Sequence, residues 1–369
     1  MRNILNKILL VSPYSEKKIG GIGTWTKNIL DYHNGNSRYD LIFLNTALFK
    51  SNVGKNKFQR LVYGVPDSLL IIILLLYKII RYHPKTIHYT SSASLALVKD
   101  LCAIYVAKLF GIKFIIHWRF GRIPELSERK NSEWKILLRV IKYAHTSIVL
   151  DQNSLQCLKN HNINNVIQIP NPISESLYKK ANEFDYKLKR ITSGVFVFVG
   201  QILPAKGIFE LVEAASRTEG IKQLILIGPV VQEVKNELIK IASCRNNGNW
   251  LTWIGEVQRE KVFPYLNTAN ALCLPSYTEG FPNVVLEAMA VGCPVIASRV
   301  GAIEEMLTSE DFGRAGITIE PKNVNQLCHA LEFMISKPEL AKEFGKNGNQ
   351  IVLLRYTLKQ VFHQYESIW

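Results

Sequence analysis

Two glutamates in the carboxyl-terminal half of the chain, Glu279 and Glu287, have seven residues between them. Residues 271–274 form a short apolar run that predicts a buried strand, and Pro282 is suited to the first turn of a following helix. The loop that carries Glu279 then falls at the carboxyl end of a strand, where open α/β sheets bind ligands. This spacing predicts a binding site with one carboxylate on a loop and one on a helix.

The start of the predicted helix has the chemistry of an anion site. If Pro282 occupies the first turn, the amides that stay available to an anion are those of Asn283, Val284 and Val285. Glu287 lies more than a turn further along and is better placed to accept hydrogen bonds from neutral hydroxyls, such as those of a ribose. A phosphate-binding site between two carboxylates is suited to a sugar nucleotide. For one carboxylate alone, the simpler alternative is a helix-start charge, with Glu287 in solvent.

A second candidate anion site follows the apolar run at residues 195–199. Gly200 and Gln201 end this predicted strand, and Lys206 and Gly207 precede an amphipathic run. A lysine in a glycine-containing loop after a strand is suited to phosphate. The alternative for an isolated Lys-Gly pair is an ordinary solvated loop.

Two further strand ends carry candidate residues. Gly21 and Gly23 lie between the first predicted strand and a predicted helix from Thr24, so backbone there can approach a phosphate closely. A plain turn has the same pattern. His117 ends another predicted strand, beside aromatic residues, where a histidine either contacts a ligand or has a purely structural role.

Strand-like apolar runs alternate with helix-length segments along the chain, which predicts parallel sheets with crossover helices. The expected strands are residues 8–12, 41–45, 86–90, 113–117, 147–151, 166–170, 195–200, 223–228, 251–255, 271–274, 294–297 and 316–320. Two half-chains of similar pattern predict two Rossmann-like domains, residues 1–170 and 171–350. The join is expected at the Pro-Asn-Pro sequence there, because two prolines around one residue stop a helix.

Composition limits the class of protein. A chain of 369 residues, 47% of them hydrophobic, is large enough for two cores. Its six cysteines are scattered without a C-x-x-C pair, which favours a reducing cytoplasm. We expect no signal peptide, and the longest apolar stretch, residues 69–80, is too short to span a bilayer.

The positive charge is concentrated in the amino-terminal half. Residues 1–180 carry 26 Lys and Arg against 10 Asp and Glu, whereas residues 181–369 carry 19 against 20. Such asymmetry is typical of proteins that face a polyanion or an anionic membrane. Residues 69–80 fit either a core helix or a helix that docks on a membrane. The basic residues around them are Lys50, Lys55, Lys57, Arg60, Lys78, Arg81 and Lys85.

The segment from residue 275 to residue 298 resembles the Glu-x7-Glu signature of glycosyltransferase family 4, which contains retaining enzymes of GT-B fold. The resemblance implies two Rossmann-like domains with parallel sheets that face each other across a cleft. It also implies a terminal helix, within residues 351–369, that returns to the amino-terminal domain. The amino-terminal domain would hold the acceptor and the carboxyl-terminal domain the nucleotide-sugar donor.

The resemblance implies roles for single residues. Glu279 would orient the transferred sugar, and His117 would contact the donor. Lys206 matches the lysine of the family pattern Gly-Arg-x4-Lys-Gly, but Gln201 replaces the arginine that shares the diphosphate charge, so another cation would have to compensate. The other predicted donor-binding residues are Gly21, Gly23, Gly280, Phe281, Asn283, Val284 and Glu287.

We therefore expect a cytoplasmic retaining glycosyltransferase, peripheral at the inner face of the membrane. It would transfer a sugar from a UDP- or GDP-sugar to a saccharide acceptor, lipid-linked, in surface-polysaccharide synthesis such as that of O-antigen or capsule. We expect no metal, no cofactor and no nucleic-acid partner. The alternatives are a sugar-nucleotide epimerase of the same fold, and a basic membrane- or nucleic-acid-binding protein with a degenerate site.

Overall fold

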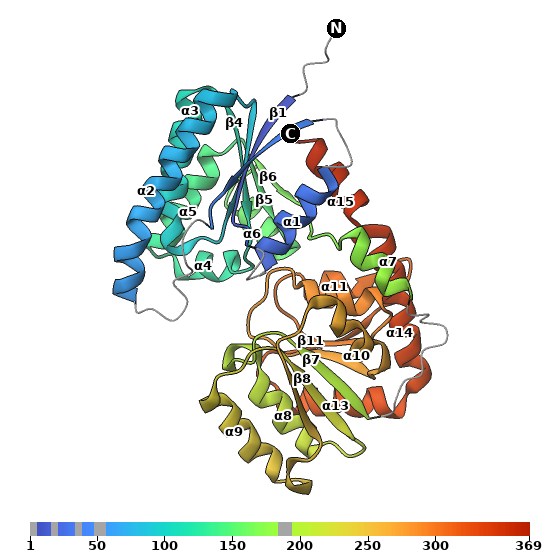
Figure 1. Cartoon of the computed structure of the whole chain (residues 1–369). Helices are drawn as coiled ribbons and strands as arrows, with labels where there is room; N and C mark the ends of the chain where they lie inside the picture. Colours follow the sequence, from blue (N-terminus) through green and yellow to red (C-terminus); the bar gives the residue numbers. More distant parts are fainter. Residues whose placement is uncertain (1–5, 16–20, 34–38, 48–56, 184–193) are drawn as a thin grey trace. The chain divides into compact units, whose positions relative to one another are not determined.

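The structure is a computed structural model that describes residues 6–15, 21–33, 39–47, 57–183 and 194–369. The chain divides into two compact units (Figure 1). The first unit comprises Met1–Pro172 together with Val361–Trp369, and the second comprises Ile173–Gln360. The sequence placed the join at residue 170 and the return to the first unit within residues 351–369.

The first unit contains a six-stranded parallel sheet with the order β2-β1-β3-β4-β5-β6. All six side chains of β3 are buried, so helices cover this central strand on both faces. The strands are β1 (Asn6–Ser12), β2 (Tyr39–Asn45), β3 (Thr86–Ser91), β4 (Lys113–Trp118), β5 (Thr146–Val149) and β6 (Val166–Gln168).

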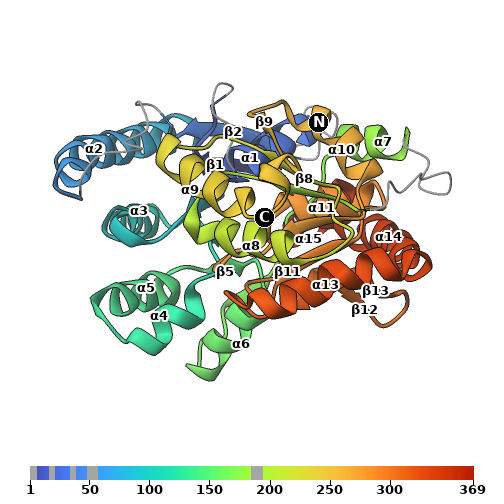
Figure 2. The same ribbon diagram turned by 90° about the horizontal axis from the view of Figure 1, so that it is seen from below.

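Helices α2, α3 and α5 lie along one face of this sheet, and α1 and α15 lie on the other (Figures 1 and 2). Successive side chains of a strand point to opposite faces. Ile87 and Tyr89 of β3 therefore join the core under α2 and α3, whereas His88 faces α1 and α15. The helices are α1 (Gly21–His33), α2 (Lys57–Tyr82), α3 (Leu97–Leu109), α4 (Ile123–Arg129), α5 (Ser132–Tyr143), α6 (Gln152–Asn160) and α15 (Leu358–Glu366).

The second unit contains another six-stranded parallel sheet, with the order β14-β11-β10-β7-β8-β9. Its strands are β7 (Val195–Val199), β8 (Gln223–Ile227), β9 (Leu251–Gly255), β10 (Ala271–Leu274), β11 (Val295–Ser298) and β14 (Gly316–Ile319), and β12 (Thr308–Ser309) pairs separately with β13 (Gly313–Arg314). The central strand β10 is buried along its whole length. This matches the continuous apolar runs of the sequence.

Helices pack on both faces of the second sheet. Helix α8 contacts α9 and α13, whereas α11 contacts α7, α10 and α14. The helices are α7 (Glu175–Glu183), α8 (Ile208–Arg217), α9 (Gln232–Ser243), α10 (Phe263–Thr268), α11 (Asn283–Ala290), α12 (Ile303–Leu307), α13 (Val324–Ser336) and α14 (Pro338–Ile351). A single π-helical turn, Val352–Tyr356, follows α14.

The predicted fold class is confirmed, because each of the twelve expected apolar runs forms a strand of one of the two parallel sheets. The start of the first helix differs from the prediction, because α1 begins at Gly21 rather than at Thr24. Among the residues that the structure describes, no helix combines the length and the apolar character needed to span a bilayer.

Candidate functional site

The switch point of the second unit's sheet lies between β7 and β10. From β7 the chain proceeds through β8 to β9 on one side, whereas β10 returns to the opposite side of β7. Loops after two such strands run in opposite directions, which leaves a place for a ligand at the carboxyl edge of the sheet. The loop after β7, residues 200–207, and the loop after β10, residues 275–282, are two of the segments in which the sequence predicted anion binding.

Backbone contacts hold these two loops together. The amide of Tyr277 donates to the carbonyl of Ala205 at 3.0 Å. Gly207 has a φ of 65°, and a Cβ atom at this position would lie 2.0 Å from the carbonyl oxygen of Pro275. Any other residue at position 207 would therefore push the loops apart, so this glycine sets their spacing.

An ion pair joins the two loops at their tips. The Lys206 ammonium lies 2.7 Å from Oε1 of Glu279, and the two side chains are 30% and 12% exposed. The structure thus brings together two residues that the sequence predicted as ligand contacts, from segments about seventy residues apart. Because Glu279 already neutralises Lys206, an anionic ligand has to share or displace this carboxylate to use the lysine.

A third loop, which follows β11, supports the backbone of Glu279. Gly301 has a φ of 55°, and a Cβ atom there would lie 2.3 Å from the carbonyl oxygen of Glu279. The amide of Ala302 donates to the carbonyl of Gly280 at 2.9 Å. The carboxyl ends of β7, β10 and β11 therefore build one site, in which glycines allow the close approach of backbone.

Helix α11 begins one residue later than predicted. It starts at Asn283, and Pro282, with a ψ of 118°, is the non-helical residue before it. The amide of Val285 donates to the Pro282 carbonyl at 3.1 Å. The prediction of three available amides is therefore wrong for Val285, because its amide is already bonded within the first turn.

Phe281, predicted as a donor-binding residue, is a buried anchor. Its side chain is buried, and its ring makes an edge contact with Tyr356 at a centroid distance of 5.4 Å. This packing ties the loop after β10 to the π-helical turn that follows α14. Phe281 therefore positions the neighbouring Gly280 and Glu279 through the backbone.

Glu287 lies within α11 and has a cationic partner that the sequence analysis missed. Its residue is only 4% exposed, so the alternative of a solvated carboxylate is wrong. Nε of Arg259 donates to Oε1 of Glu287 at 2.8 Å, and Nη2 of Arg259 contacts the same oxygen. Arg259 stands shortly after β9, again at the carboxyl edge of the sheet. A basic residue shortly after a predicted strand is the sequence signal that could have identified Arg259.

Gln201 stands at the end of β7, where the family pattern has arginine. It is exposed, and Gly200 before it packs closely on the end of β8. A Cβ atom on Gly228 would lie 1.9 Å from the Gly200 carbonyl oxygen. The position of Gln201 is therefore fixed by the sheet. Arg259, another cation of this unit, is paired with Glu287.

In the first unit, His117 is fully buried in β4 and belongs to a chain of polar contacts. Its Nδ1 lies 3.2 Å from Nε2 of His88, and its Nε2 lies 3.1 Å from Nη1 of Arg119. The indole N–H of Trp369 donates to Nδ1 of His88 at 2.9 Å. The rings of Trp25 and Tyr365 close this cluster.

The protons in this chain cannot satisfy every contact at once. Trp369 and Arg119 can only donate, so the outer nitrogen of each histidine has to accept. Two neutral imidazoles would then both carry their proton on the inner nitrogens, where His88 and His117 face each other. One contact is therefore unsatisfied in the neutral pair. All the remaining contacts can be satisfied if Arg119 turns to another acceptor, because Nε2 of His117 can then carry the proton.

Both imidazoles are held neutral. Burial, and secondly the nearby Arg119 guanidinium, lowers the pKa of His88 to about 3. Burial followed by Arg119 also holds the pKa of His117 well below its ordinary value. A neutral, buried His117 suits hydrogen bonding to an uncharged group, and it excludes His117 as a cation for phosphate.

Arg119 is a cation with no carboxylate partner among the described residues. Its guanidinium lies 4.9 Å from the centroid of the Trp25 ring, and its Nε has no hydrogen-bond partner among them. Burial lowers the pKa of Arg119 to about 10, so the side chain stays charged at neutral pH. An unneutralised guanidinium at the carboxyl edge of a sheet is suited to an anionic group.

The predicted glycine-rich loop is described only in part. Gly21 and Gly23 lie in the first turn of α1, and residues 16–20 lie outside the described residues. A Cβ atom on Gly23 would have no heavy atom within 4 Å. Among the described residues, no atom therefore fills the space beside this glycine.

Residues 179–351 match the family model of glycosyl transferases group 1. The matched residues lie within the second unit. The putative teichuronic acid biosynthesis glycosyltransferase TuaC of Bacillus subtilis is 31% identical over 177 residues, which are 47% of this chain and 42% of TuaC. The chain spans about half of the length of the curated relatives that it matches.

Solved structures resemble the whole chain. Sucrose-phosphate synthase from Thermosynechococcus elongatus has a TM-score of 0.76 at 18% identity, over 98% of both chains. HepE of Anabaena, solved in complex with UDP, has a TM-score of 0.73 at 15% identity, over 99% of both chains. This likeness confirms the predicted GT-B fold of two parallel-sheet domains.

Proposed function

We propose that this chain is a retaining glycosyltransferase that transfers a sugar from a UDP- or GDP-sugar to a lipid-linked saccharide acceptor. The observation that supports this most directly is the pair of Lys206 and Glu279, held by three loops at the switch point of the second unit. An ammonium suits phosphate, and the carboxylate beside it suits sugar hydroxyls. TuaC is a putative glycosyltransferase of teichuronic acid synthesis, which supports a role in polysaccharide assembly.

In this proposal the second unit binds the donor. The Lys206 ammonium and the amides of Asn283 and Val284 stabilise the negative charge that develops on the departing diphosphate. Glu287, with one oxygen held by Arg259, presents the carboxylate to the ribose. HepE was solved with UDP and with UDP-glucose, which supports a uridine diphosphate donor.

Glu279 orients the sugar rather than attacking it. We assign it this role because Lys206 pairs with its carboxylate, which lowers the nucleophilicity of the oxygens. We propose that departure of the diphosphate and attack by the acceptor hydroxyl occur on the same face of the sugar, which preserves its configuration. The leaving phosphate then takes the hydroxyl proton. Since lysine and amides carry the diphosphate charge, no metal is needed.

The acceptor is assigned to the first unit. Arg119 supplies an unneutralised cation for an anionic group such as a lipid phosphate. His117 can donate to an uncharged oxygen once Arg119 turns away from its Nε2. The enzyme would work at the inner face of the membrane, where a lipid-linked acceptor is displayed.

The test is donor cleavage by purified protein with a panel of UDP- and GDP-sugars and no acceptor. We expect slow release of UDP or GDP from one donor, abolished in Glu279→Gln and Lys206→Ala but unchanged in Lys180→Ala. Lys180 forms a surface ion pair with Glu260 in the same unit, so it is a matched control. No release from any donor would contradict the proposal. Interconversion of the sugar without transfer would identify an epimerase instead.

A further inference from the structure

Helix α2 is apolar on two opposite faces. One face carries Ile71, Leu75 and Ile79, which are buried in the core of the first unit. A helix packed on a sheet normally turns polar residues to solvent on its other side. Here the outward residues are Val65 (61% exposed), Leu69 (62%), Ile73 (52%), Tyr77 (57%) and Ile80 (59%). Their spacing of three to four residues forms one continuous stripe.

Helix α3 continues this exposed apolar surface. It lies beside α2, and Val98, Tyr105 and Leu109 point outward from it, followed directly by exposed Phe110. Leu109 is 83% exposed. By contrast, the exposed large apolar residues among the described part of the second unit are scattered over Val231 and α9, α14 and the turn after α14. A contiguous apolar surface on two neighbouring helices marks an interaction site.

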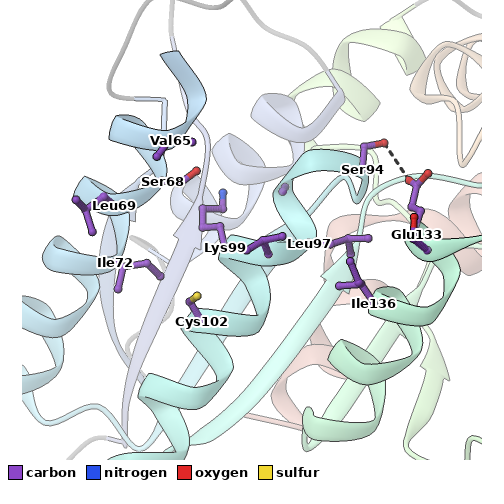
Figure 3. A pocket seen from close by; sticks show the side chains of 13 residues that line it. Val65, Ser68, Leu69, Ile72, Ser94, Leu97, Lys99, Cys102, Glu133 and Ile136 are labelled. Atoms are coloured by element: carbon purple, nitrogen blue, oxygen red, sulfur yellow. Dashed lines mark hydrogen bonds between the residues drawn. The ribbon is translucent and has the colours of Figure 1, made fainter. Parts of the chain in front are cut away.

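A groove of about 890 Å³ opens into this surface. Figure 3 shows Val65, Leu69 and Ile72 of α2 on one side and Leu97 and Cys102 of α3 on the other. Val65 and Leu69 belong both to the exposed stripe and to the groove wall. An apolar chain can therefore pass from the outer surface into the groove without crossing water.

The polar groups of the groove stand at defined places. Lys99 brings its ammonium between α2 and α3 (Figure 3). Ser94 lies where the chain leaves β3, at the carboxyl edge of the sheet, and its hydroxyl is bonded to Glu133 at 3.1 Å. The groove thus has polar groups on its α2 side and on its α5 side, and apolar walls elsewhere, as suits an amphiphilic molecule (Figure 3).

The charge of these helices indicates which kind of surface the exposed apolar stripe binds. Helices α2, α3 and α5 carry nine Lys and Arg against three Asp and Glu. One of the three acids, Asp100, is fully buried and bonded to Ser91, so it does not offset the outward positive charge. An apolar stripe bordered by basic residues is complementary to the anionic surface of a bilayer. Lys50, Lys55, Lys57 and Arg60 lie outside the described residues or have side chains that are not described.

We propose that α2 and α3 lie on an anionic membrane and that the groove between them seats the hydrocarbon chain of a lipid from that membrane. This inference deepens the proposed function, because a lipid-linked acceptor presents such a chain. The first unit would then hold the acceptor at the leaflet from which it comes. Binding of lipid needs no sugar donor, so it can be tested separately from transfer.

Two exposed cysteines allow access to the groove to be compared with access to a reference site in the same protein. Cys102 lines the groove, and Cys244 is exposed in the second unit. We would measure maleimide alkylation of each by peptide mass spectrometry. Vesicles of phosphatidylcholine with 30% phosphatidylglycerol are expected to slow alkylation of Cys102 about tenfold and to leave Cys244 unchanged. High salt should restore the rate. Equal rates with and without vesicles, or equal protection of both cysteines, would overturn membrane docking.

The same measurement identifies the occupant of the groove. Dodecyl phosphate below its micelle concentration should protect Cys102 without vesicles, whereas inorganic phosphate should not. Ile136→Trp, which narrows the groove, should remove this protection but keep vesicle binding. If dodecyl phosphate does not protect Cys102, the proposal that the groove holds a hydrocarbon chain is wrong. Protection that rises with protein concentration alone would instead identify a second copy of the chain.

A matched pair of substitutions tests the exposed stripe. Ile73→Ser in α2 should weaken partitioning onto the anionic vesicles about five- to tenfold, since about half of an isoleucine side chain loses its apolar environment. Leu353→Ser is the control, because Leu353 is 54% exposed in the second unit and Ile73 is 52% exposed. Equal effects of the two substitutions would overturn the assignment of the surface.

Discussion

In the second unit the cations at the edge of the sheet lie against carboxylates, whereas in the first unit Arg119 has none among the described residues. Lys206 pairs with Glu279 and Arg259 pairs with Glu287. Arg119 instead stacks on Trp25 and contacts a neutral histidine. The second site is therefore neutralised before a ligand arrives, and its charges hold the loops in place. The first site carries positive charge that a ligand can neutralise.

This difference predicts how the loss of a charged side chain at each site changes the stability of the folded protein. A buried carboxylate with a partner is tolerated, but the same carboxylate without the partner is strongly destabilising. Removal of a cation from the second unit therefore leaves a buried negative charge behind. Removal of Arg119 leaves no charge behind. Loss of a cation should thus destabilise the second unit more than the first.

The largest effect is expected for Lys206→Ala. We expect kcat/KM for the donor to fall about 100- to 1,000-fold, or about 3–4 kcal/mol, because Gln201 cannot share the diphosphate charge. Gln201→Arg in the same chain should recover part of this loss. Steady-state kinetics of the two single variants and the double variant measure both effects. If the arginine leaves the Lys206→Ala defect unchanged and donor binding unimproved, missing charge at position 201 is not the reason for it.

The comparison itself is tested by Arg259→Ala and Arg119→Met. Arg259→Ala should lower the free energy of unfolding by about 2–3 kcal/mol, since the Glu287 carboxylate, in a residue only 4% exposed, loses its partner. Arg119→Met should change it by about 1 kcal/mol or less, because the contacts with the Trp25 ring and with Nε2 of His117 are lost but no buried charge is left without a partner. Denaturant titration gives both values. Equal destabilisation would show that the two units do not differ as inferred.

A third prediction concerns acid. The folded-state pKa of His88, about 3, lies below its unfolded value of 6.5, so the stability it contributes is present above pH 6.5 and is lost as the pH falls. Between pH 6.5 and pH 5 the loss is about 2 kcal/mol. His88→Gln should flatten the profile of unfolding temperature against pH in this range. An identical profile would mean that His88 is not buried in its neutral form.

Asp100 provides the control of opposite sign. Burial raises its pKa from 3.8 to about 6, so its contribution to stability is present below pH 3.8 and is lost as the pH rises through 6. Asp100→Asn should therefore stabilise the protein at pH 7 relative to pH 4. Calorimetry at the two pH values should show the His88 and Asp100 variants changing the profile in opposite directions.

The smallest effect is expected for chelation. We expect donor cleavage to be unchanged in EDTA, because Lys206 and the start of α11 hold the diphosphate without a divalent ion. A titration of activity against EDTA, followed by magnesium or manganese, measures this. Loss of activity that the metal restores would show that the two cation–carboxylate pairs are insufficient for the chemistry.

The local pattern of apolar and polar residues was enough to predict the strands and the helices between them. Apolar runs such as those at residues 195–199 and 271–274 identify strands because a strand covered on both faces has few alternatives to continuous apolar sequence. The sequence also located Lys206 and Glu279 at strand ends, since a carboxyl edge can be recognised from the strand before it. Local pattern could not give the helix start at Asn283, because Pro282 suits the residue before a helix as well as its first turn.

The partners of these residues were decided by tertiary structure. Glu287 and Arg259 are 28 residues apart, and no pattern in either segment indicates the other. His88 meets His117 only because β3 pairs with β4 in the register that sets Thr90 beside His117. Pairing depends on sheet order and register, which arise from the packing of the whole unit. The sequence by itself therefore determined which residues stand at the edges of the sheets, and the tertiary structure decided which charges are neutralised there.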